Sequence, residues 1–226
     1  MNQPELWNYT STLRKQTGDK YNGRALIGRD TPIDGGVYYG VYSDGGEALV
    51  VDTQKYPDMY DSWSDMVRER ASVDGKLIRN LILNAVYETV LEQMPYSQKG
   101  VDDLLASIPD YKSGDKVALD SFMEHHVGVC RHQALAAGVL IEKLVKDGTL
   151  GGHVSVDRSQ QSPKGDPEGH AWVRYTNSGG HIYIIDVANK IAAPLHEAND
   201  KGVWNYMRPE DRLTRRLGHT AFPSAS

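Results

Sequence analysis

The chain has 226 residues, of which 39% are hydrophobic, and a net charge of −5. This length provides for one large or two small globular domains with a buried core. The mildly acidic balance excludes the basic surface that binds nucleic acid or an anionic membrane. The single cysteine excludes an internal disulfide and any four-thiolate zinc or iron–sulfur site.

The chain lacks targeting and membrane signals. No apolar run is long enough to span a bilayer, and the first residues lack the order of a signal peptide. We therefore expect a soluble, cytoplasmic protein, or part of a larger secreted protein if the chain is an excised domain. We expect neither a membrane nor a nucleic acid as partner, and the oligomeric state stays open.

The first part of the chain, residues 1–56, is predicted to be a β-rich region packed on the rest. Three runs are typical of short strands, at 24–28, 36–42 and 47–52. Two interpretations of the tyrosines at 38, 39 and 42 remain open, namely a surface for a partner and core packing.

Helical spacing of apolar residues begins near Asp58. It predicts a first helix with Met59, Trp63 and Met66 on one face, a second over 77–94 that ends before Pro95, and a third, shorter helix from Val101. Residues 134–144 are apolar almost all round, which predicts a buried central helix that begins near Cys130 and stops at Asp147 and Gly148.

Short strands are predicted after this helix, at 153–157, 170–175 and 181–187. Helices followed by a sheet indicate an α+β fold, with a core over 57–190. The remaining residues, 191–226, are predicted to form loops and one short helix near 208–217.

Cys130 stands at the predicted start of the central helix. The free backbone N–H groups and the dipole of a helix N-terminus favour a thiolate there, and Gly128 permits a tight approach. The same N–H groups, including that of Cys130, are suited to hold the oxyanion of acyl transfer. We therefore treat Cys130 as a candidate nucleophile, against the alternative of a small core residue.

His170 and Asp186 lie on consecutive predicted strands. A turn centred on Ser178, with Gly179 left-handed, would place them directly opposite each other, at a distance that suits a hydrogen bond. Asp186 would orient the imidazole, whose other edge would face Cys130. Each residue alone has a structural explanation, but the three together predict a thiol catalytic site.

Other polar and aromatic residues around these motifs remain secondary candidates. Trp172, two residues after His170, is expected either to wall the site against water and bind substrate or to be a core aromatic. Asp157 and Arg158 are candidates for a substrate groove or ordinary surface charges. The cluster of His125, His126, Cys130 and His132 matches no standard zinc motif, so no metal is expected.

The segment from Leu77 to Val187 resembles the transglutaminase-like superfamily of papain-fold thiol enzymes. Three blocks carry the resemblance: Gly-Val-Cys at 128–130, His-Ala-Trp-Val at 170–173 and Ile-Asp-Val at 185–187. It implies a papain-like core whose central helix packs on an antiparallel sheet. It also implies that Cys130 is the nucleophile, His170 the general base and acid, and Asp186 the orienting acid. Papain's own signature and the paired cysteines of peptide N-glycanases are missing.

These observations predict cysteine-dependent acyl transfer from an amide of a protein or peptide, through a thioester and without a cofactor. Water is the favoured acceptor, which gives a peptidase or amidase. The alternative is a protein glutamine transglutaminase or deamidase. A hypothesis from another class is a non-catalytic binding domain that retains the fold and buries Cys130.

Overall fold

The computed structural model describes residues 19–39, 46–159 and 169–211. Tyr42 and most of the predicted 208–217 helix lie outside these residues. Within them the chain is a mixture of helices and several sheets, so the predicted α+β class is confirmed. In the described part of the chain, no helix is long and apolar enough to cross a membrane.

A four-stranded antiparallel sheet, in the order β11-β10-β9-β8, forms one layer. β9 is buried along most of its length because its alternate side chains enter two separate hydrophobic clusters, one on each face of the sheet. The four strands are β8 (Gly152–Ser159), β9 (His170–Asn177), β10 (Ile182–Asp186) and β11 (Ile191–Pro194).

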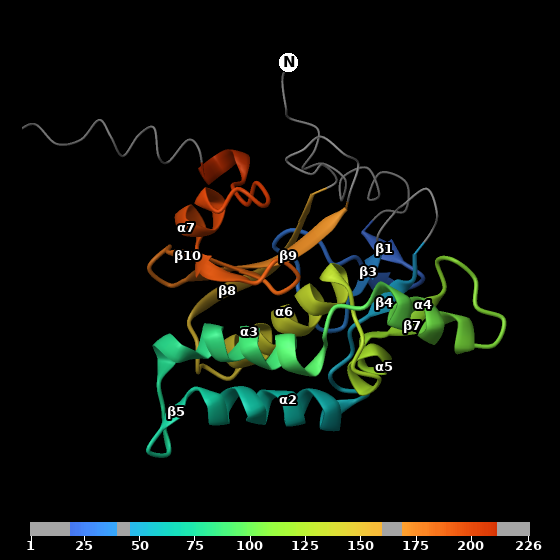
Figure 1. Ribbon diagram of the computed structural model, residues 1–226, viewed down its shortest axis with the longest axis horizontal. Coiled ribbons are helices and arrows are strands. Elements are labelled where there is room, and N and C mark those ends of the chain that lie inside the picture. The colour runs from blue at the N-terminus through green and yellow to red at the C-terminus, as the bar shows by residue number, and fades with distance from the viewer. Residues whose placement is uncertain (1–18, 40–45, 160–168, 212–226) are drawn as a thin grey trace, which may run out of the picture.

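The helix α6 (Cys130–Lys146) is the central helix that the sequence predicts, and Asp147 follows it as predicted. It packs on β8, β9 and β10 on one side and on α3 (Ile82–Gln93) on the other. Figure 1 shows it between the sheet and the lower helices, while α7 (Leu195–Asp200) covers the opposite face of the sheet. Its apolar circumference follows from this double coverage.

The remaining helices lie around this centre. α2 begins with Pro57 at its first position, where a missing N–H costs nothing, and it packs on α3 as the outermost layer in Figure 1. The short hairpin β5–β6 and a 3₁₀ turn separate these two helices. The bounds are α2 (Pro57–Arg70), β5 (Ser72–Val73), β6 (Lys76–Leu77), 3₁₀ turn (Arg79–Leu81), α4 (Gln98–Ser107) and α5 (Leu119–Glu124).

The N-terminal β region packs on the core rather than standing apart. β4 pairs antiparallel with β3 and parallel with β7, which precedes α5. Ile33, Tyr38 and Leu49 belong to the same buried cluster as α6. The strands are β1 (Lys20–Tyr21), β2 (Arg24–Ala25), β3 (Val37–Tyr39), β4 (Ala48–Val50) and β7 (Lys116–Ala118).

Candidate active site at the start of helix α6

Cys130 is the first residue of α6, and the turn before it is held by contacts of Gly128. The backbone N–H of Ser97 donates to the carbonyl of Gly128 at 2.8 Å. A Cβ atom at Gly128 would lie 2.5 Å from Met94 Sδ and 3.0 Å from His132 Cβ, so any other residue would force these neighbours to shift. The expected tight approach at Gly128 is therefore present.

The structure brings Cys130, His170 and Asp186 together. His170 Nε2 lies 2.6 Å from Asp186 Oδ2, and both side chains are buried. Because Nε2 faces the carboxylate, the opposite edge of the ring is left for Cys130, and each of the two groups shifts the pKa of the other. Cys130 is half-buried, and its thiol donates to the carbonyl of Gly169 at 3.9 Å.

The predicted centre of the β9–β10 turn is wrong by one residue, and the predicted register of the two strands is therefore wrong. Ile185 pairs with Val173, which centres the turn on Gly179 rather than Ser178, and Gly180 is the left-handed residue. The reason is the Asn177 side chain, whose Oδ1 accepts from the N–H groups of both Gly179 and His181. His170 and Asp186 are consequently diagonal partners, and they still share a face because the side-chain period is two.

Burial and mutual charge set the ionisation of these groups. Burial raises the pKa of the Cys130 thiol, but the hydrogen bond and charge of His170, with a contribution from Arg131, lower it below its ordinary value. Burial lowers the pKa of His170, but Asp186 and Cys130 raise it to about 9. Both shifts favour the thiolate–imidazolium form of the pair over the neutral form.

A buried carboxylate from the N-terminal region holds the two residues that follow Cys130. Glu47 accepts two hydrogen bonds from Arg131, at 2.7 and 3.0 Å, and lies 3.0 Å from His132 Nε2. His132 Nδ1 accepts the N–H of Val129, so the neutral ring carries its proton on Nε2 and caps the helix start. Burial opposes ionisation of Glu47, but His132 and Arg131 lower its pKa to about 2.

Three residues beyond the sequence-predicted set surround the His170–Asp186 pair. Asn189 Nδ2 lies 3.0 Å from Asp186 Oδ2, and its N–H donates to Oδ1. Tyr206 donates its hydroxyl to Oδ2 at 2.8 Å. Trp204 stacks on the imidazole with ring centroids 4.7 Å apart. The sequence marks only Trp204 and Tyr206, as an aromatic pair in a segment with no other pattern, and nothing in it marks Asn189.

A cavity of about 570 Å³ opens beside Cys130 and His170, and Trp204 lines it. Trp172 does not line it: its indole is fully buried, 5.9 Å from His170 by ring centroids and edge-on to Tyr206. The aromatic wall expected from Trp172 is therefore supplied by Trp204. The lining residues are Tyr96, Gln98, Val129, Cys130, Arg131, Gly169, His170, Ala188, Asn189 and Trp204.

Asp157 and Arg158 do not line this cavity either. Asp157 is buried and paired with Arg208, while Arg158 donates to the carbonyls of Tyr39 and Ile27. They are structural groups rather than parts of a groove at Cys130.

The histidines near Cys130 have separate partners. His125 and His126 bond to the carbonyls of Ser121 and Gln93. Among the described residues, no three His, Cys, Asp or Glu side chains gather as metal ligands.

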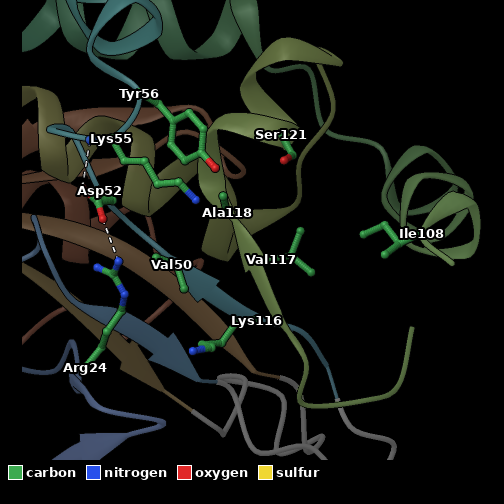
Figure 2. A pocket seen from close by; sticks show the side chains of 10 residues that line it. All are labelled: Arg24, Val50, Asp52, Lys55, Tyr56, Ile108, Lys116, Val117, Ala118 and Ser121. Carbon is green, nitrogen blue, oxygen red and sulfur yellow. Dashed lines mark hydrogen bonds and ion pairs between the residues drawn. The ribbon is translucent and has the colours of Figure 1, made fainter. Parts of the chain in front are cut away.

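A second cavity, of about 400 Å³, lies by β4, β7 and α5, away from Cys130. Figure 2 shows its cationic lining: Arg24 is paired with Asp52, and the ammonium of Lys55 lies over the ring of Tyr56. The ten residues drawn include neither cysteine nor histidine. This cavity therefore offers neither a thiol nor an imidazole base, and the candidate active site is the one at Cys130.

No protein-family model matches the chain, and no curated protein matches it.

Proposed function

We propose that the protein is a cysteine-dependent enzyme with a papain-like, transglutaminase-like core that transfers the acyl group of an amide to water. The observation that carries this proposal is the thiol of Cys130 at the first residue of α6, on the same cavity as a histidine that is itself held by Asp186. A helix start, a base and an orienting acid are the parts that thiol catalysis requires.

In the first half of the reaction, the Cys130 thiolate attacks the amide carbonyl carbon and a C–S bond forms. The N–H of Cys130, unpaired within the first turn of the helix, is suited to stabilise the oxyanion. His170 then donates its proton to the leaving nitrogen, and the C–N bond breaks. The amine leaves, and a thioester remains on Cys130.

In the second half, neutral His170 removes a proton from water, which attacks the thioester. The C–S bond breaks, the acid is released, and thiolate and imidazolium are restored. Asp186 stays ionised throughout: burial raises its pKa, but His170, Asn189 and Tyr206 lower it below its ordinary value. Water, the acceptor favoured from the sequence, is kept in this proposal, and the cavity beside Cys130 has room for it together with substrate.

The first test is alkylation by iodoacetamide across pH, read by intact mass. The chain has one cysteine, so each adduct reports Cys130 alone. We expect a labelling midpoint well below the free-thiol pKa of about 8.5, and a return toward that value in His170→Ala. The matched control is His181→Ala on the same hairpin. Slow labelling of the folded native chain would rule out the proposal.

The second test uses dimethylated casein as the amide donor, with and without cadaverine. New N-termini would identify a peptidase, and ammonia release with conversion of glutamine to glutamate would identify a deamidase. Incorporation of cadaverine would instead identify a transglutaminase and overturn the choice of water. Cys130→Ser should abolish whichever product forms.

A further inference from the structure

The segment from Val203 to Asp211, here called the C-terminal strap, returns from α7 to the candidate active site. Its burial alternates: Trp204, Tyr206 and Arg208 are buried, while Val203 and Asn205 are exposed. Alternation of this kind is typical of a strand. Yet no backbone–backbone hydrogen bond joins residues 203–207 to any other described residue. Side chains therefore hold the strap in place.

Two of its inward side chains contact the His170–Asp186 pair. Tyr206 is fully buried and donates its hydroxyl to Asp186 Oδ2, the same oxygen that lies 2.6 Å from His170 Nε2. Trp204 stacks on the imidazole with an interplanar angle of 16°. The carboxylate and the ring are thus each fixed by a strap residue as well as by each other.

The far end of the strap is anchored by charge pairs, and those with Asp157 and Arg174 are buried while Asp30 is half-exposed. Arg208 binds Asp157 through Nε at 2.8 Å and through Nη2 at 2.6 Å, and its Nη1 reaches Asp30 at 2.9 Å. Asp211 accepts two hydrogen bonds from Arg174 on β9, at 2.6 and 2.9 Å. Pairs of this kind add little net stability but fix one geometry, because any other leaves a buried charge alone.

We infer that the C-terminal strap is a control element of this site, in which Tyr206 is the positioning residue for Asp186 and His170, and Arg208 holds Tyr206 in place. The inference rests on the proposed function only in that the pair activates Cys130. Because residues 203–207 have no backbone pairing to the sheet, loss of the Arg208 anchor loosens Trp204 and Tyr206 together, although Asp211 stays paired with Arg174. The reactivity of Cys130 then depends on a contact remote from the sulfur.

The test begins with Tyr206→Phe in the full chain, with Tyr175→Phe as the matched control. Tyr175 lies on the same sheet, and its hydroxyl bonds to the carbonyl of Gly151 instead. The readouts are the titration of the His170 ring by NMR and the alkylation rate of Cys130. In Tyr206→Phe the carboxylate turns more freely and spends less time on His170. We expect the His170 midpoint to fall by about 1 pH unit and alkylation at pH 7 to slow by about tenfold.

Arg208→Lys tests the anchor, since Arg208 touches neither His170 nor Asp186. It keeps the charge but loses the planar fork, so we expect shifts in the same direction as those of Tyr206→Phe. Far-UV circular dichroism checks that it folds. If it does not, Arg208→Met combined with Asp157→Asn removes both charges of the pair and takes its place.

The two proposals fail in different ways. Slow alkylation in the native chain would defeat the proposed function, yet the His170 titration would still report on the strap. If folded Tyr206→Phe and Arg208→Lys both titrate and alkylate like the native chain, the strap is only packing and the inference is wrong.

Discussion

Catalysis needs Cys130 deprotonated and His170 protonated, so alkylation and hydrolysis should depend on pH in different ways. Alkylation needs only the thiolate, so it should rise through the lowered pKa of Cys130 and then stay level. Hydrolysis also needs the imidazolium to protonate the leaving amine, so it should fall as pH rises past about 9, where His170 loses its proton. Both rates measured on one preparation would show this divergence. Hydrolysis that still climbs at higher pH would contradict it.

Glu47 should contribute acid-sensitive stability. Its pKa is about 2 in the folded chain against an ordinary value of 4.5, so its stabilisation is fully present above pH 4.5 and is lost as pH falls toward 2. Glu47→Gln leaves Arg131 without its counter-charge and should lower the free energy of unfolding by about 3 kcal/mol at pH 7. Urea unfolding between pH 7 and pH 3 would show this gap narrowing; a constant gap would count against an ionised Glu47.

At the scale of elements, the start of α6 depends on the absence of a side chain at Gly128. Gly128→Ala would push Met94 or the helix start aside, because its Cβ would lie 2.5 Å from Met94 Sδ. We expect a loss of about 1–3 kcal/mol in thermal or urea unfolding. Gly46→Ala is the control, since a Cβ there meets nothing within 4 Å. Equal effects from the two substitutions would show that the close approach is unimportant.

The elements with long or repeated patterns could be predicted from the sequence. The central helix and the strands around His170 and Asp186 were expected near their observed positions because each carries many apolar residues. β7, α5, β11 and α7 were not predicted, since each is short. β7 is also a parallel partner of β4, far away in the chain. The hairpin register depended on side-chain bonds of Asn177 that apolar spacing does not reveal.

At the scale of the whole molecule, the candidate site is joined by contacts that local patterns cannot express. The sequence identified Cys130, His170 and Asp186 as a set, and the structure brings them together. It did not identify Glu47, Trp204 or Tyr206, because a carboxylate before a strand and aromatics in an unpatterned segment match many ordinary structural roles. Their importance comes from long-range contacts, because the segment before β4 and the C-terminal strap both reach the site.

The same long-range ties should make unfolding cooperative. Glu47 binds Arg131, and Arg158 donates to the carbonyls of Tyr39 and Ile27. The β4–β7 pair adds a backbone ladder between the N-terminal region and the core. We therefore expect circular dichroism and the fluorescence of the buried Trp63 and Trp172 to follow one urea transition. Two separated transitions would mean that the N-terminal region is an independent unit.

The alternation of buried and exposed residues along the C-terminal strap also sets which sequence changes it can absorb. Replacement of Val203 changes only an outward side chain, and replacement of the exposed Asn205 removes only its hydrogen bond to the N–H of Met207. Deletion of one residue between Trp204 and Arg208 shifts the alternation by one position. Either Trp204 or Arg208 would then point outward. In a mutational library, this segment should therefore accept many substitutions at alternate positions and reject almost every single-residue insertion or deletion.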